Sequence, residues 1–229
     1  MRGEIVWTPN DNQARKTRLF EFANGAGFEE LHKWSVQSPD QFWRKIWQVC
    51  GVVGEQGERA IQKAAIPSDP SAQFIATRFF PDAKLSIVEN FLKRTGSGEA
   101  LVAIDETGKR TSRTWDELRE RVASLASALQ SLGVTEGDRV VAWLPNAIEV
   151  VETMLASASI GAIFSSCSPD FGAQGVLDRF SQITPKVLVA TDSYIYGGKK
   201  FDCLERLAVV RKGLPSLKAT LLVSQNAQA

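Results

Sequence analysis

The chain has 229 residues, of which 44% are apolar and 23% are charged, and its formal net charge is +1. This composition is ordinary for a soluble globular protein, and the near-zero charge gives no basis for nucleic acid or an anionic membrane as a partner. The three cysteines are widely spaced and include no Cys-x-x-Cys pair. They argue against a disulfide framework and a zinc site, and they predict a reducing, cytoplasmic location.

No secretory or membrane-spanning segment is expected. Residues 1–7 contain no apolar stretch typical of a signal peptide. Residues 153–169 lack charge, but they include five serines and fall short of the about 20 apolar residues that a spanning helix needs. We interpret this stretch as packed interior.

The first part of the chain is predicted to be mostly helical and is rich in tryptophan. One helix is expected over residues 13–23 and another near Ser38, with Pro39 at its first position. The aromatic side chains of this second helix either attach the N-terminal part to the main body or form a platform for an aromatic ligand. A polar loop is expected over residues 54–73. His32, the only histidine, has no identifiable Ser or Cys partner and is interpreted as structural or exposed.

The second part alternates strands and helices. Four buried strands separated by three amphipathic helices are predicted between Thr111 and Ser224, with the strands at residues 139–144, 162–165, 187–190 and 220–224. This alternation is typical of an α/β fold with a parallel sheet and right-handed crossovers. An edge strand is expected over residues 100–105, followed by a turn at 106–109.

Local signals give the helix boundaries in this part. Thr114 and Glu117 form a capping box that begins the helix before the first core strand. Asn146 is expected to cap the next helix, and a last helix is expected to run from Phe201 through Leu207. The helix after Asn146 is expected to face inward with Ile148, Val151, Met154, Leu155 and Ala158.

Two loops after strands are candidates for ligand binding, since ligands of such sheets usually sit where the strands end. The first is Ser165-Ser166-Cys167-Ser168-Pro169-Asp170-Phe171-Gly172. Its Asp170 could act as a general base, but Pro169-Asp170 is also ordinary turn chemistry. The second is Gly197-Gly198-Lys199-Lys200, which lacks the Walker spacing because Ser193 stands where a glycine is needed. It either holds a phosphate through backbone N–H groups or forms a polar turn before a helix.

Several segments together resemble the adenylate-forming acid–CoA ligases. The similarity lies in Trp7-Thr8-Pro9, in Trp34-Ser35 with Phe42-Trp43, in residues 80–85 with Glu89-Asn90, and in residues 165–172; Asp178-Arg179-Phe180 and residues 185–188 and 192–199 extend it over nearly all of the chain. The loop over residues 165–172 resembles members that activate acetoacetate more than those that activate acetate. Ser86 stands where the family usually carries Asn.

The resemblance implies an acetoacetate–CoA ligase that uses ATP, CoA and Mg²⁺ and passes through an acyl-adenylate. It divides the chain into an N-terminal extension, residues 1–95, and an incomplete N-terminal part of the AMP-binding domain, residues 96–229. The family's Ser/Thr/Gly-rich ATP loop does not occur in the sequence, and the family's adenylation lysine belongs to a C-terminal domain. The chain is therefore expected to be an N-terminal portion that is inactive alone, with no catalytic or metal-binding residue assigned. ATP, CoA and Mg²⁺ are expected to bind fully only to the complete enzyme. The alternative is a non-catalytic remnant or interaction module.

The same resemblance implies a small set of cofactor-binding residues. Tyr196, Gly197, Gly198 and Lys199 match the turn that faces the adenosine phosphate end of CoA, although the relatives carry arginine at the positions of Tyr196 and Lys199. Ser168, Pro169 and Asp170 match residues along the pantetheine path. The substrate partner is a small acid such as acetoacetate, and protein partners stay open.

Overall fold

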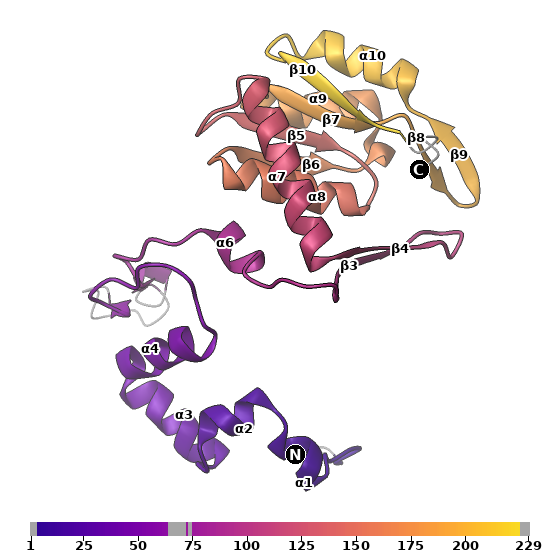
Figure 1. The fold of residues 1–229 in the computed structure, drawn as a ribbon. Helices are drawn as coiled ribbons and strands as arrows, with labels where there is room; N and C mark the ends of the chain where they lie inside the picture. Colours follow the sequence, from indigo (N-terminus) through magenta and orange to yellow (C-terminus); the bar gives the residue numbers. More distant parts are fainter. Residues whose placement is uncertain (1–3, 64–71, 73–74, 225–229) are drawn as a thin grey trace. The chain divides into compact units, whose positions relative to one another are not determined.

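The computed structural model describes residues 4–63, 72 and 75–224, and its chain divides into two compact units, Met1–Ser86 and Ile87–Ala229 (Figure 1). Each unit is described by itself.

The first unit is mostly helical. The helix expected over residues 13–23 is two helices, because the Thr17 hydroxyl accepts from the Phe20 N–H and starts a new helix there. The second expected helix begins at Pro39, as predicted. The loop expected over residues 54–73 lies partly outside the described residues, and within it a short strand pairs with another near residue 78. The elements are α1 (Asp11–Arg15), α2 (Arg18–Ala23), α3 (Phe28–Gln37), α4 (Pro39–Val49), and the antiparallel strands β1 (Ile61–Gln62) and β2 (Arg78–Phe79).

Aromatic side chains of the first unit pack on one another. Phe42 of α4 contacts Trp34 of α3 and Phe22 of α2 edge-on, with ring centroids 5.4 and 5.8 Å apart. These half-buried rings therefore pack against one another within the unit. His32 is exposed and stacks on Phe28 at 6.2 Å, in agreement with the interpretation as an exposed histidine.

The second unit contains the predicted parallel sheet. Its four strands lie in the order β10-β7-β5-β6, and every neighbouring pair is parallel. Sequence and structure therefore agree on the α/β class and on all four strands, within about two residues at their ends. The strands are β5 (Arg139–Trp143), β6 (Ile163–Cys167), β7 (Val187–Thr191) and β10 (Ala219–Val223).

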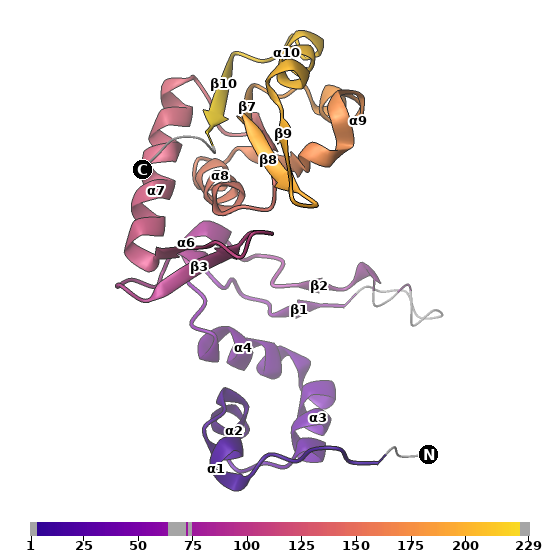
Figure 2. The same cartoon turned by 90° about the vertical axis from the view of Figure 1, so that its right-hand side faces the viewer.

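Helices cover both faces of this sheet (Figure 2). Alternate residues of β5 point to opposite faces: Val140 and Ala142 pack with the cluster from α7 and α8, whereas Val141 and Trp143 pack with α9 and α10. The central strands β5 and β7 are consequently buried on both sides and read as continuous apolar runs. The helices of this unit are α6 (Ile87–Phe91), α7 (Trp115–Ser131), α8 (Ile148–Ser159), α9 (Gly172–Phe180) and α10 (Leu204–Gly213).

Of two predicted helix starts, one is confirmed and one is wrong. The capping box at Thr114 is confirmed, with the Thr114 hydroxyl and the Glu117 carboxylate each accepting from the other's backbone N–H. Asn146 does not cap α8, whose N-cap is Ala147 without a side-chain hydrogen bond, because the helix begins one residue too late for Asn146 to reach its first turn.

The buried face of α8 also differs from the prediction. Met154, expected inside, is 36% exposed, while the polar Glu152 and Thr153 are buried. The polar groups tolerate burial because they have partners: Glu152 accepts from Arg113 of β4 at 3.1 Å, and the Thr153 hydroxyl donates to the Glu149 carbonyl at 2.6 Å. Ile148 and Leu155 are buried as predicted, and Val151 and Ala158 are half-buried, so the buried face includes most of the predicted one and extends to these two polar residues.

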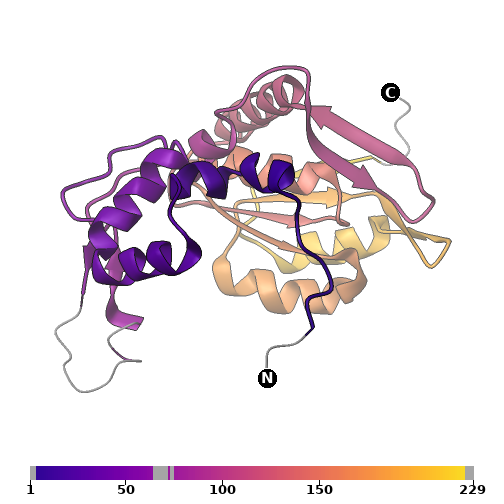
Figure 3. The ribbon, with the colours of Figure 1, turned by 90° about the horizontal axis from the view of Figure 1, so that it is seen from below.

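Two antiparallel hairpins stand apart from the main sheet, and Figure 3 shows both. The strand expected over residues 100–105 is β3 (Glu99–Ile104), which pairs with β4 (Arg110–Thr114) in a sheet of its own and is not an edge of the main sheet. The second hairpin joins β8 (Ser193–Tyr196) to β9 (Lys199–Asp202). The helix expected from Phe201 is therefore wrong at its start: Phe201 lies in β9, opposite Tyr194, and α10 begins at Leu204.

Candidate functional site

The carboxyl ends of β5, β6 and β7 lie along one edge of the parallel sheet. The strands end at Trp143, Cys167 and Thr191, and their registers place Trp143 beside both Cys167 and Ala190. The loop after β6 leaves the sheet at this edge, and the β8–β9 hairpin that carries the second segment begins there, two residues after the end of β7. Ligands of open α/β sheets bind outside such ends, so the structure brings the two candidate segments to one side of the fold.

The loop after β6 is a short, well-defined turn. Pro169–Phe171 form a 3₁₀ turn whose preceding Ser168 hydroxyl donates to the Asp170 carboxylate at 2.9 Å and accepts from the Asp170 N–H at 3.4 Å. Pro169 is buried, whereas Asp170 is exposed. The loop therefore presents one carboxylate, held by its neighbouring serine, at the surface of the sheet edge.

The cysteine that ends β6 does not add a nucleophile to this loop. Cys167 is buried, and burial raises the pKa of its thiol to about 11, with a small opposing effect from Arg179. A thiol with this pKa is protonated at neutral pH, and the thiolate is the reactive form. Cys167 is thus part of the packed interior beneath the loop.

The second candidate segment is the tip of the β8–β9 hairpin. Tyr196 and Lys199 are opposite each other, and Gly197 and Gly198 make the two-residue turn with φ of 57° and 72°. Consecutive positive φ values of this kind are open to glycine at little cost, and this is the usual chemistry of tight hairpins. The prediction of a polar turn before a helix is wrong, because a strand follows the turn.

The glycine turn is accessible and carries charge around it. Tyr196 is 59% exposed, Lys199 is exposed, and a Cβ added at either glycine would meet nothing within 4 Å. The Gly198 N–H donates at 3.4 Å to the Glu106 carboxylate at the tip of the β3–β4 hairpin. The two hairpin tips lie near each other in Figures 1 and 3. The turn can therefore offer a backbone N–H and a lysine to an anion, and a carboxylate of the chain already uses the N–H.

A cavity of about 320 Å³ lies between the β3–β4 hairpin, the loop after β5 and the β8–β9 hairpin. It was not predicted from the sequence. Its walls come from the turn of the β3–β4 hairpin, the loop after β5 and the start of the β8–β9 hairpin. The cations that line it are Lys109 and Lys200, and the amide of Asn146 and the ring of Tyr194 face it as well. No local pattern marks this combination, because the three segments are at least 35 positions apart in the chain.

Sequence reasoning also missed a group of side chains below the hairpin. Arg206 of α10 lies with its guanidinium carbon 5.9 Å from the ring centroids of both Tyr194 and Trp143. Its guanidinium donates to the Asp202 carbonyl at 3.0 Å. The arginine therefore connects α10 with the last residue of β5 and the first half of the hairpin. Trp143 is completely buried, so this group rests on the packed interior.

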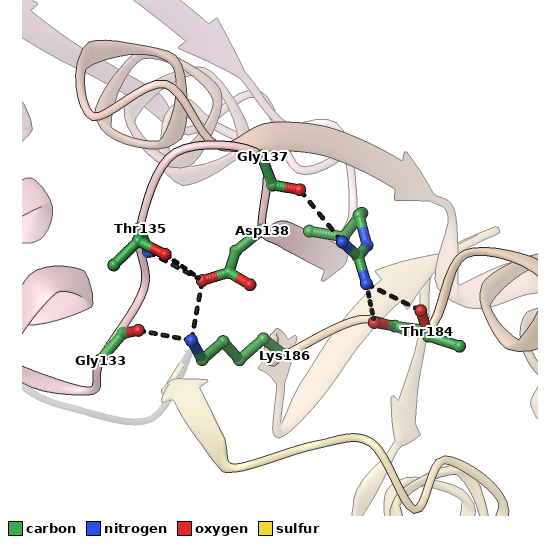
Figure 4. Close-up of polar contacts among 7 residues, drawn as sticks. Gly133, Thr135, Gly137, Asp138, Thr184 and Lys186 are labelled. Atoms are coloured by element: carbon green, nitrogen blue, oxygen red, sulfur yellow. Dashed lines mark hydrogen bonds and ion pairs between the residues drawn. The ribbon is translucent and has the colours of Figure 1, made fainter.

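The opposite edge of the sheet carries a polar cluster of a different kind (Figure 4). The Lys186 ammonium donates to the Asp138 carboxylate at 2.7 Å and to the Gly133 carbonyl at 2.5 Å. Thr135 donates to the same carboxylate through its N–H and its hydroxyl, at 2.8 and 2.9 Å. Hydrogen bonding to Lys186, followed by the Thr135 N–H, lowers the pKa of Asp138 to about 2. Each of these polar groups is satisfied within the chain, so the cluster holds the amino ends of β5 and β7 together.

Two other types of site are absent from the part of the chain that the structure describes. Within the ranges 4–63, 72 and 75–224, no group of three or more His, Cys, Asp or Glu side chains could hold a metal ion. No helix in the same ranges has the length and apolar character needed to cross a membrane.

Comparison with known proteins places this chain beside CoA ligases. The sequence model of a family described as AMP-binding enzyme matches residues 88–229. The acetoacetyl-coenzyme A synthetase of Rhizobium meliloti is 42% identical, over 91% of this chain and 32% of that protein. The acetoacetyl-CoA synthetase of Danio rerio is 39% identical over 97% of this chain and 34% of that protein. A malonamoyl-CoA synthetase of Penicillium aethiopicum is 33% identical over 96% of this chain and 32% of that protein.

A solved structure agrees with these sequence matches. The acetoacetyl-CoA synthetase from Streptomyces lividans superposes with a TM-score of 0.82 at 35% identity, over 99% of this chain and 36% of that chain. The chain thus spans about a third of the length of the curated relatives it matches.

Proposed function

Because this chain belongs to the AMP-binding enzyme family, we propose that it forms the N-terminal, CoA-facing part of an acetoacetate–CoA ligase. The proposed reaction joins acetoacetate to CoA at the expense of ATP, with AMP and pyrophosphate as products and an acyl-adenylate between the two half-reactions. ATP, CoA and Mg²⁺ are its proposed cofactors, and the cytoplasm is its proposed location. Residues 1–95 are proposed as an N-terminal extension and residues 96–229 as part of the AMP-binding domain.

The observation that carries the proposal is the exposed glycine turn at the carboxyl edge of the sheet. Gly197 and Gly198 have positive φ values, and Lys199 beside them is exposed. A turn of this type presents a backbone N–H group and a point charge, which suits the phosphates at the adenosine end of CoA. We assign Tyr196, Gly197, Gly198 and Lys199 to that end, and Ser168, Pro169 and Asp170 to the path of the pantetheine arm.

The names of two relatives indicate the chemical class of the acid substrate. One acts on acetoacetate and another, 33% identical, on malonamate. Both acids have a carbonyl group at the carbon β to the carboxylate, and this carbonyl carries a methyl group in acetoacetate and an amino group in malonamate. We propose that the acid used with this segment belongs to the same class, a short acid with a β-carbonyl group.

The proposal is tested by a chimera. This chain would replace the corresponding 36% of the Streptomyces lividans acetoacetyl-CoA synthetase, which it matches at a TM-score of 0.82. Acetoacetate, malonamate and butyrate would be compared by the loss of free CoA thiol in the presence of ATP and Mg²⁺. We expect thioester formation with the two β-carbonyl acids and much less with butyrate.

A folded chimera that forms no thioester would contradict the assignment to an acetoacetate–CoA ligase. A chimera that prefers butyrate would contradict the β-carbonyl class while leaving the ligase assignment in place.

A further inference from the structure

The cavity between the β3–β4 hairpin, the loop after β5 and the β8–β9 hairpin adjoins the glycine turn. Ile195 and Lys200, which line the cavity, flank residues 196–199 on either side. The Gly198 N–H of the turn donates at 3.4 Å to the carboxylate of Glu106, which lines the cavity as well. A ligand bound at the turn therefore has this cavity directly beside it.

The size and charge of the cavity suit a neutral group with both hydrogen-bond donors and acceptors. Its volume of about 320 Å³ is near the lower end of the range of about 300–1,000 Å³ for small-molecule sites, so it suits one part of a molecule as long as CoA. Its lining includes two carboxylates, Asp105 and Glu106, and two ammonium groups, Lys109 and Lys200. These opposite charges balance, so the cavity has no excess positive charge to attract a further phosphate.

One wall of the cavity supplies an apolar surface. Ile195 and Lys200 are opposite each other in the β8–β9 hairpin, so their side chains leave the same face of this two-stranded sheet. The Ile195 side chain is 43% exposed, although isoleucine is among the residue types that are most often buried. Pro145 of the loop after β5 lines the same cavity. Apolar walls with a few polar groups are the usual lining of sites for small organic ligands.

Asn146 supplies the polar group that gives the cavity its specificity. It follows Pro145 at the carboxyl end of β5 and lines the cavity. It was expected to cap α8, but the N-cap of this helix is Ala147. Across the part of the chain that the structure describes, the Asn146 amide makes no hydrogen bond to another residue. A primary amide has a donor and an acceptor side by side, and this pair matches the N7 and the N6 amino group of adenine.

We propose that this cavity is the subsite for the adenine base of CoA, with the Asn146 amide on the N6/N7 edge of the base and Ile195 against its face. The inference rests on the proposed function, because the glycine turn is the segment assigned to the adenosine phosphates. In CoA one ribose carries both the 3′-phosphate and the base, so a phosphate at the turn places the base close by. The cavity is the adjoining space with the size and the hydrogen-bonding groups for it.

The test compares two nucleotides that differ only in the base edge that Asn146 reads. Adenosine 3′,5′-bisphosphate and inosine 3′,5′-bisphosphate would be titrated into the ¹⁵N-labelled full chain, and Kd values would be obtained from the amide shifts. Inosine has an oxygen in place of the N6 amino group, so the amide can make only one of its two bonds. The unchanged chain should bind the adenine nucleotide about five-fold more tightly, the lower end of the discrimination supplied by a bidentate base contact.

Two variants assign this preference to residues. Asn146→Ala should raise the Kd for adenosine 3′,5′-bisphosphate by about five-fold and remove the preference over inosine. Ile195→Thr keeps a β-branched residue in the strand and should raise the Kd for both nucleotides by about two-fold, because a contact with the face does not depend on the edge. Both variants should leave the binding of 4′-phosphopantetheine, which has no base, unchanged. Because the two residues lie in separate segments, a folding defect in one variant leaves the other as a test.

A matched control removes an amide elsewhere in the second unit. Gln130 of α7 is exposed and does not line the cavity. Gln130→Ala should leave all three Kd values unchanged, and each variant would be checked for an unchanged melting temperature. If Gln130→Ala weakens binding of the adenine nucleotide as much as Asn146→Ala does, the base subsite is overturned.

The outcomes separate the base subsite from the proposed function. If the unchanged chain binds neither CoA nor adenosine 3′,5′-bisphosphate, both fall. If the chain binds CoA but Asn146→Ala keeps the preference for adenine, or if no preference exists, the base subsite is overturned while the proposed CoA site stands. Tighter binding of ATP than of adenosine 3′,5′-bisphosphate would assign the cavity to the nucleotide substrate and overturn its assignment to CoA.

Discussion

The two edges of the parallel sheet use the same residue types for different purposes. At the amino edge, Lys186 lies beside Gly133 and Asp138 and donates to both, at 2.5 and 2.7 Å. At the carboxyl edge, Lys199 follows Gly197 and Gly198 and is exposed. Among residues 4–63, 72 and 75–224, the Lys199 ammonium has no ion-pair partner within 4.0 Å.

This difference separates a structural polar cluster from a candidate binding site. A buried or half-buried polar group that is satisfied inside the chain has nothing left to offer a ligand, and its loss is felt as lost stability. An exposed lysine without an ion-pair partner contributes little to the free energy of folding, and removing it mainly lowers the affinity for an anion. Glycine and lysine side by side in the sequence indicate neither role until their partners are known.

The largest expected effect is on stability at the amino edge. Asp138→Asn should lower the free energy of unfolding by about 2 kcal/mol at pH 7, because it removes the charge that accepts from Lys186 and Thr135. Urea unfolding followed by circular dichroism measures this change. Glu99→Gln is the matched control: the carboxylate pairs with Arg110, but both side chains are about half exposed, so the loss should be below about 1 kcal/mol.

The pH dependence of this effect has a definite sign. The pKa of Asp138 is about 2 in the folded chain, below the ordinary value of 3.8. A carboxyl group with a lowered folded-state pKa stabilises the fold above its unfolded pKa, and that stabilisation is lost as the pH falls toward the folded pKa. The difference between Asp138→Asn and the unchanged chain should therefore shrink between pH 4 and pH 2. A difference that stays constant over this interval would mean that the charge of Asp138 does not carry the effect.

A smaller effect is expected on ligand binding at the carboxyl edge. Lys199→Ala should raise the Kd for CoA by about five-fold, as expected for one exposed charge contact, and should leave the urea midpoint nearly unchanged. Lys218→Ala is the matched control, because Lys218 is exposed too but lies at the amino edge, where its N–H donates to the Lys186 carbonyl. Equal losses from the two variants would show that Lys199 acts only through the overall charge.

The smallest expected effect is an increase in affinity. The Glu106 carboxylate accepts from the Gly198 N–H at 3.4 Å and occupies the position that a phosphate would take in the proposed complex. Glu106→Gln removes the competing charge and should lower the Kd for CoA by about two-fold. Glu136→Gln, at a turn before β5, is a control of the same chemistry. Weaker binding by Glu106→Gln would show that the carboxylate supports the ligand site instead of competing for it.

Much of the fold could be read from local patterns. The four core strands, the capping box at Thr114 and the start of α4 at Pro39 each depend on residues within a few positions of one another. The start of α10 was predicted too early, at Phe201. Two adjacent glycines between two short runs that contain aromatic residues are a local hairpin signal, and here Gly197-Gly198 join β8 to β9.

The rest depends on partners that are far away in the sequence. The inward face of α8 includes Glu152 only because Arg113, 39 residues earlier, pairs with it. The candidate site was found in part: the loop after β6 and the glycine turn were located, but Arg206 and Tyr194 were not. Arg206 of α10 lies 5.9 Å from the centroid of the Tyr194 ring of β8, and no spacing rule connects positions that only folding brings together.

The central claim is that the carboxyl edge, and not the amino edge, binds CoA. Titration of CoA into the ¹⁵N-labelled chain tests it most directly, because each edge has its own glycine amides. The account predicts that the amide signals of Gly197, Gly198 and Asp170 shift on addition of CoA while those of Gly133 and Gly137 stay in place. Shifts at Gly133 and Gly137 with none at Gly197 and Gly198, or no shifts at saturating CoA, would contradict it.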